Sequence, residues 1–82
     1  MGSAKALHSQ RYKAIVGQLR AARLSAELTQ LELGRRIGQS QSWVAKGERG
    51  ERRLDFAEVA DWCSACGITV ESLLDDSKKR KR

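Results

Sequence analysis

Two predicted helices separated by only three residues constrain the fold of this 82-residue chain more than any other feature. Thr29 and Glu32 form a T-x-x-E capping box, which predicts that a helix begins there. Gly38 is predicted to end this helix, because glycine readily adopts the left-handed conformation that follows many helices. Ser40 can cap a second helix over residues 41–49, which the next glycine would end. The sequence therefore predicts two short helices joined by a tight turn.

The rest of the chain also follows a helical pattern, with apolar residues three and four positions apart. A first helix is predicted over about residues 9–23. A second capping box, Asp55 with Glu58, begins a fourth helix that continues to Cys66, and Thr69 caps a short fifth helix. The predicted fold is an all-α bundle of five short helices. The positions predicted to face its core are Tyr12, Ile15, Val16, Leu19, Leu33, Ile37, Phe56, Val59, Ala60, Cys63, Cys66, Val70, Leu73 and Leu74.

Length and composition allow one domain and favour helices. The chain has no proline and many good helix formers. A domain this small buries only about 60% of the surface that its unfolded chain exposes. That leaves little room for an enclosed substrate pocket and makes dimerisation useful for stability. We expect residues 9–76 to form the domain and residues 1–8 and 77–82 to be disordered.

The charged residues are unevenly distributed along the chain. The net charge is +6, but residues 1–24 hold five basic residues and no acid, whereas residues 51–77 hold two basic and seven acidic residues. A tail of five basic residues, 78–82, follows. This distribution indicates a molecule with two different faces, and a basic face suits a polyanion such as DNA.

Several classes of protein are not expected. No apolar run approaches the roughly 20 residues of a membrane span, and the charge from Lys5 to Leu24 argues against a signal peptide, so we expect a cytoplasmic protein. Cys63 and Cys66 form a lone C-x-x-C, and His8 is the one histidine, so the chain falls short of the about four ligands of a structural zinc site. We expect buried thiols, no metal and no cofactor. We expect no enzyme either, because no nucleophile and base form a recognisable set.

Two helices joined by a short turn that contains glycine are typical of the helix-turn-helix motif, whose second helix fits the major groove of DNA. Gly34 is small enough to let the second of these helices pack closely across the first. Residues 15–74 resemble the phage-repressor, Cro-like (XRE-type) family. The resemblance lies above all in LTQLELGRRIGQSQSWVAKGERGERRLD, from Leu28 to Asp55, and in the later GITVESLL. It implies a lambda-repressor-like DNA-binding domain.

The resemblance also implies a role for individual positions. Side chains on the third helix would meet base edges, and side chains at the start of the second helix and after the third would hold phosphates. An ion pair of Arg23 with Glu48 would tie the first helix to the end of the third. The implied base contacts are Gln41, Ser42, Trp43 and Lys46. The implied phosphate contacts are Gln30, Arg49, Arg52 and Arg53.

Some of these residues have a structural alternative. Trp43 is equally suited to cover the core, and Arg52 and Arg53 can be ordinary loop charges. Gly47 departs from the family, because a bulky apolar residue usually stands there, and it leaves a hole unless Trp43 or Trp62 fills it. Glycine inside a helix also costs roughly 0.5–1 kcal/mol relative to alanine.

The expected function is that of a dimeric repressor of an inverted-repeat operator, in the manner of a phage or plasmid regulator, a restriction-modification controller or an antitoxin-like autorepressor. Double-stranded DNA and a second copy of the chain are the expected partners, and a toxin or polymerase is a further one. The acidic later helices should point away from DNA, which makes them the expected dimer surface. The residues expected there are Trp62, Ile68, Val70 and Leu74.

Two other functions stay open from the sequence. A protein-interaction adaptor would keep the fold without reading bases, and Gly47 and the acidic half of the chain motivate this alternative. Non-specific nucleic-acid binding, driven by the basic tail, is the other. Such binding should weaken steeply as the salt concentration rises.

Overall fold

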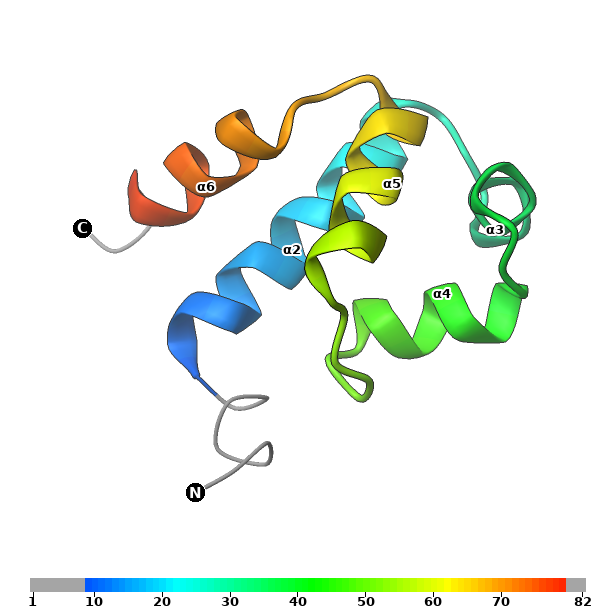
Figure 1. Ribbon diagram of the computed structural model, residues 1–82, viewed down its shortest axis with the longest axis horizontal. Coiled ribbons are helices and arrows are strands. Elements are labelled where there is room, and N and C mark those ends of the chain that lie inside the picture. Colours follow the sequence, from blue (N-terminus) through cyan, green and yellow to red (C-terminus); the bar gives the residue numbers. More distant parts are fainter. Residues whose placement is uncertain (1–8, 80–82) are drawn as a thin grey trace.

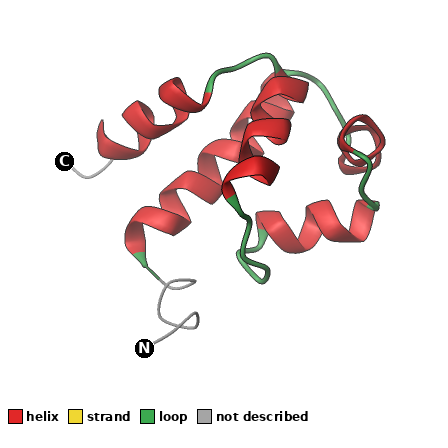
Figure 2. Ribbon diagram, in the orientation of Figure 1, coloured by secondary structure: helices red, strands yellow, loops and turns green. Residues whose placement is uncertain are grey.

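The computed structural model describes residues 9–79, and all secondary structure in that range is helical (Figure 2). The predicted all-α fold is confirmed. The expectations for residues 1–8 and 80–82 lie outside the described residues. The helices are α2 (Gln10–Ser25), α3 (Gln30–Ile37), α4 (Gln41–Glu48), α5 (Phe56–Cys66) and α6 (Val70–Lys79).

Hydrogen bonds at the helix starts explain where the chain becomes helical. The Thr29 hydroxyl accepts from the amide of Glu32 at 3.0 Å, and the Glu32 carboxylate accepts from the amide of Thr29 at 2.8 Å. Asp55 and Glu58 form the same reciprocal pair, at 2.8 and 2.9 Å. Both predicted capping boxes are confirmed, and the hydroxyl of Ser40 caps α4 as predicted.

The helices surround one core. α2 and α5 run alongside each other, and α6 packs on α2 (Figure 1). α3 and α4 pack against each other and are joined by the turn at residues 38–40. Because α4 also packs on α2, and α3 on α5, the pair is held against the rest of the molecule.

The turn between α3 and α4 depends on two glycines. Gly38 ends α3 with a φ of 74°, in the left-handed region that side chains disfavour. A Cβ atom on Gly34 would lie 2.5 Å from the carbonyl oxygen of Gln39 and 3.2 Å from that of Ser40. No side chain fits at position 34, so this glycine allows the chain entering α4 to lie close against α3.

The core is centred on Trp62. Its side chain has no exposed surface, and its indole Nε1 donates to the carbonyl oxygen of Leu19 at 3.1 Å. Trp62 also fills the space beside Gly47, so the expected hole is not formed. Each helix contributes one further side chain with almost no exposed surface, so all five share the core. These side chains are Leu19, Leu33, Val44, Cys63 and Leu73.

Two predicted core positions are wrong. Phe56 is 74% exposed, because it is the first residue of α5 and stands beyond the edge of the core. Leu54, just before the helix, takes the buried position at that end. Leu74 is 38% exposed, whereas its neighbour Leu73 is buried.

Three predicted boundaries also shift. α2 continues to Ser25, past its predicted end at about residue 23. α4 ends at Glu48, and Arg49 serves as its C-cap, one residue earlier than predicted. α6 continues to Lys79, past the predicted domain boundary at residue 76. No glycine or proline stands there to end the helix, and lysine is a good helix former.

Candidate nucleic-acid interface

One side of α4 faces away from the core and carries polar side chains. Gln41, Ser42 and Lys46 are exposed, and Ala45 is half-buried among them. At 3.6 residues per turn, these four positions share one continuous side of the helix. We call this side the α4 stripe, and it offers three polar groups to another molecule.

The first side chain of the α4 stripe is held by a series of hydrogen bonds. Gln41 Nε2 donates to Gln30 Oε1 at 2.9 Å, and Gln30 Nε2 donates to Glu48 Oε1 at 3.0 Å. A carboxylate only accepts hydrogen bonds, so Glu48 binds the amide nitrogen of Gln30. The amide oxygen of Gln30 therefore points toward Gln41. Both glutamines are predicted interface residues, but the bond between them is a feature that only the structure shows.

Arg23 and Glu48 form a buried ion pair beneath these glutamines. Arg23 donates through Nε to Oε2 and through Nη2 to Oε1, the latter at 3.0 Å, and the two side chains are 8% and 3% exposed. Arg23 Nη1 donates to the carbonyl oxygen of Leu28 at 2.7 Å. Buried charges are tolerated only with such close pairing. The structure thus brings together the two residues that the family resemblance pairs, and they join α2 to the end of α4.

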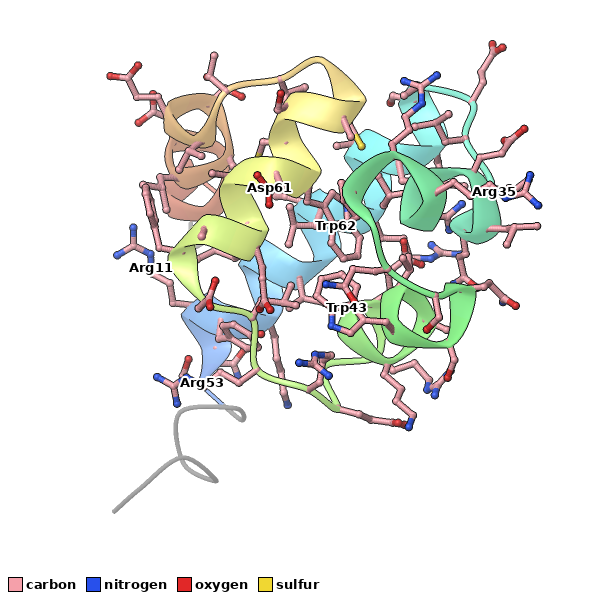
Figure 3. All side chains as sticks on the ribbon, turned by 45° about the vertical axis from the view of Figure 1, so that its right-hand side comes forward. Arg11, Arg35, Trp43, Arg53, Asp61 and Trp62 are labelled. Carbon is pink, nitrogen blue, oxygen red and sulfur yellow. The ribbon has the colours of Figure 1, made fainter. Side chains whose placement is uncertain are left out.

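Trp43 does not lie on the α4 stripe. Its side chain is only 9% exposed, and its ring centre lies 6.1 Å from that of Trp62, with the ring planes tilted by 40° (Figure 3). The implied base contact of Trp43 is therefore wrong, because the indole covers the core. The guanidinium carbon of Arg52 lies 5.2 Å from the centre of the Trp43 ring, within the range of a cation–π interaction.

Tyr12 anchors the loop between α4 and α5. Its hydroxyl donates to the carbonyl oxygen of Arg52 at 3.2 Å and accepts from the amide of Leu54 at 3.0 Å. Arg52 is therefore held through its backbone by Tyr12 and through its side chain by Trp43. Arg53, the next residue, is exposed.

Arg49 bonds to an acid within the same loop. Its Nε and Nη2 donate to the carboxylate of Glu51 at 2.9 and 3.2 Å. The hydrogen bond from Arg49 holds the pKa of Glu51 below its ordinary value, and the same bond raises the pKa of Arg49. A phosphate at Arg49 would have to compete with this carboxylate.

The comparisons with known proteins agree with this geometry. A family profile described as a helix-turn-helix domain matches residues 14–75. An XRE-family like protein from Pseudomonas syringae pv. tomato str. DC3000 has a similar structure, with a TM-score of 0.82 and 39% sequence identity over 96% of both chains. The chain belongs to the XRE-type helix-turn-helix family. Membership of this family indicates a DNA-binding transcription regulator.

Two other solved structures resemble this XRE-type chain. Both are of the clp gene regulator ClgR from Corynebacterium glutamicum. One has a TM-score of 0.79 and 24% identity over 85% of this chain and 74% of that one. The other has a TM-score of 0.77 and 25% identity over 84% of this chain and 88% of that one. No curated protein matches the sequence.

The four residues expected at a dimer surface of this XRE-type protein differ in how far their side chains are exposed. Trp62 is fully buried, so its predicted contact with a second chain is wrong. Ile68 and Val70 are half-buried and pack against the core. Leu74 retains the largest exposed fraction of the four.

The described residues of the XRE-type domain offer little other chemistry. They include no group of three or more His, Cys, Asp or Glu side chains placed to hold a metal ion. Cys63 and Cys66 are free thiols, and burial raises the pKa of each. A raised pKa disfavours the reactive thiolate. Within residues 9–79, every helix is too short or too polar to cross a membrane.

The interface roles of three residues are not predicted from the sequence, although Tyr12 is predicted as a core position. Ala45 lies four residues after Gln41, and this spacing is the signal that places it on the α4 stripe. Arg20 lies one turn before Arg23 on α2, and its Nε is 3.8 Å from Glu48 Oε1. Tyr12 has no local signal, because its contacts lie about 40 residues along the chain.

Proposed function

We propose that this protein is a sequence-specific repressor that binds an inverted-repeat operator as a dimer. One observation carries the proposal. Gln41 stands exposed at the start of α4, and its amide is oriented by Gln30 and, through it, by the buried Glu48. A side chain that is already oriented loses less conformational entropy on binding than a mobile one.

The orientation of Gln41 leaves suitable groups for reading a base. One N–H is given to Gln30, so the carbonyl oxygen and the second N–H remain. A bidentate pair with adenine needs an acceptor for the N6 amino group and a donor for N7, and Gln41 supplies both. Lys46 suits guanine, and Ala45 suits the methyl group of thymine.

The loop after α4 and the start of α3 are assigned to the DNA backbone. Arg52 is pre-positioned by Tyr12 and Trp43, and Arg53 is exposed beside it. Gln30 keeps a second N–H for a phosphate. Contacts of this kind set the register of α4 in the groove and carry no sequence information themselves. Arg49 contributes least, because it is paired with Glu51.

An adaptor without base readout is less well supported. Gly47 motivated that alternative, and Trp62 fills the space beside it, so α4 keeps its packing. Two similar structures are of a clp gene regulator, which favours regulation over an adaptor role. Non-specific binding through the basic tail stays a prediction, because residues 80–82 lie outside the described part of the chain.

Selection of binding sites from random duplex DNA, at near-physiological salt, tests the proposal. We expect an enriched inverted repeat whose half-sites lie about one helical turn apart, roughly 34–36 Å. A matched protein that lacks residues 78–82 should enrich the same repeat. A folded protein that enriches no sequence, or one whose binding vanishes with the tail, would contradict sequence-specific recognition.

A further inference from the structure

A cavity of about 310 Å³ lies between α3 and α5 and is open to solvent. Its walls are Arg36 and Ile37 at the end of α3 and Asp61, Ser64 and Ala65 on α5. Ile37 is the last residue of α3, directly before the turn into α4. The cavity therefore lies beside the helix-turn-helix, but its walls come from α3 and α5 rather than from the α4 stripe.

One wall of the cavity presents a positively charged group that is oriented by a hydrogen bond. Arg36 Nη1 donates to the carbonyl oxygen of Ala65, in the last turn of α5, at 3.2 Å. This is the one hydrogen bond that the Arg36 side chain makes within residues 9–79, and a guanidinium has several further N–H donors. The rest of the planar group is therefore available to a carboxylate, which it can bind through two parallel hydrogen bonds.

The other wall of the cavity carries the opposite charge. Asp61 lies on the exposed side of α5 (Figure 3). Among the described residues its carboxylate has no hydrogen-bond or ion-pair partner, and it does not pair with Arg36, although both line the same cavity. The hydroxyl of Ser64, three residues further along α5, is also unbonded in this part of the chain. The cavity thus contains an acid and a base that do not neutralise each other.

These walls fit a small molecule that carries both charges. Arg36 would repel a diamine, and Asp61 would repel a phosphate or a dicarboxylate. An α-amino acid instead presents its carboxylate to Arg36 and its ammonium group to Asp61. Ile37 and Ala65 supply apolar surface for its side chain. Ligand cavities span about 300–1,000 Å³, so the volume here suits an amino acid better than a nucleotide.

We infer that the cavity between α3 and α5 binds a zwitterionic α-amino acid with an aliphatic side chain. The carboxylate pairs with Arg36, the ammonium group pairs with Asp61 and donates to the Ser64 hydroxyl, and the side chain lies against Ile37 and Ala65. This inference goes beyond the proposed function and does not depend on it. Because the ligand is small and the cavity is open, the dissociation constant is expected to be about 1–10 mM.

The test is an NMR titration of the isotope-labelled protein with three probes of the same carbon skeleton. L-leucine carries both charges, isocaproate lacks the ammonium group and isoamylamine lacks the carboxylate. Arg36→Gln and Asp61→Asn each remove one charge from the cavity, and Arg35→Gln, on the exposed side of α3, is the matched control. Asp61→Asn is nearly isosteric and breaks no contact within residues 9–79, so it remains informative even if Arg36→Gln, which loses the bond to Ala65, unfolds.

We expect L-leucine to shift the amide resonances of the cavity walls in a saturable manner, and each analogue to bind about five-fold more weakly. Asp61→Asn and Arg36→Gln should weaken the binding of L-leucine by about the same factor, and Arg35→Gln should leave it unchanged. Shifts that do not saturate, isocaproate that binds as tightly as L-leucine, or full affinity in Asp61→Asn would each overturn the inference. The titration contains no DNA, so such a failure leaves the proposed function untouched.

Discussion

A Cβ atom on Gly47 would lie 3.3 Å from Cζ3 of Trp62, so the indole occupies the space that a side chain at position 47 would need. The ring cannot easily move away, because it is fully buried and its Nε1 is bound to the carbonyl oxygen of Leu19. The glycine in α4 and the tryptophan in α5 are therefore complementary in volume.

Substitutions at Gly47 test this complementarity. Gly17→Ala, at an open helical position, should raise the free energy of unfolding by roughly 0.5–1 kcal/mol. Gly47→Ala should gain less, because Trp62 must shift. Gly47→Leu should lower the free energy of unfolding by about 1–3 kcal/mol through overpacking. Urea unfolding measures all three, and a Gly47→Leu protein as stable as wild type would contradict the fit.

Removal of the Glu48 carboxylate should be among the most damaging single changes. Glu48→Ala leaves Arg23 charged, buried and without its partner, which costs about 3–5 kcal/mol. It also frees the amide of Gln30 to rotate. Glu51→Ala breaks an exposed ion pair in the nearby loop and should change the stability little. Equal stability losses in the two variants, measured by urea unfolding, would contradict this account of the network.

Arg52 is predicted to contribute to DNA binding through its stacking as well as its charge. Arg52→Gln should reduce the slope of log affinity against log salt by about one. Arg52→Lys should keep that slope but bind more weakly, because lysine lacks the planar group that stacks on Trp43. Arg35→Gln, on the exposed side of α3 (Figure 3), is the charge-matched control. Salt titrations that show the same slope change for Arg35→Gln would refute a specific role.

Acid should destabilise the domain partly through Glu32. The backbone amide and side chain of Thr29 hold the pKa of Glu32 below its ordinary value of 4.5. Since the folded pKa is the lower one, the stabilisation is present above pH 4.5 and is lost as the pH falls through the folded pKa. Urea unfolding at a series of pH values should therefore show a weaker acid dependence for Glu32→Gln than for wild type. Identical pH profiles would rule out this contribution.

The parts of the fold that depend on neighbouring residues were predictable from the sequence. The reciprocal bonds of Thr29 with Glu32 and of Asp55 with Glu58 form within one helical turn, so the two capping boxes locate α3 and α5. The turn at Gly38 is equally local. Helical spacing alone places Gln41, Ser42 and Lys46 on one side of α4.

The parts that depend on distant contacts were not predictable. Phe56 lies on the same helix face as Cys63, so its spacing predicts a core position. The core ends before it, because the buried Leu54, whose amide is bound by Tyr12, occupies that end of the core. The spacing of Trp62 along the chain fits a surface position and a core position equally. In the structure its ring is buried in the space that Gly47 leaves open. The bond between Gln30 and Gln41 requires the crossing of α3 and α4, which no spacing rule gives.

Gln41 is proposed to read a base through an amide that Gln30 orients, and one measurement tests this role most directly. Affinities of wild type and Gln41→Ala are compared on the enriched site and on duplexes with each base pair replaced in turn. We expect Gln41→Ala to lose about 1–3 kcal/mol of discrimination at one base pair in each half-site and to keep it elsewhere. Gln18→Ala, a change between α2 and α6, should alter nothing. Full discrimination at every position by Gln41→Ala would contradict the account.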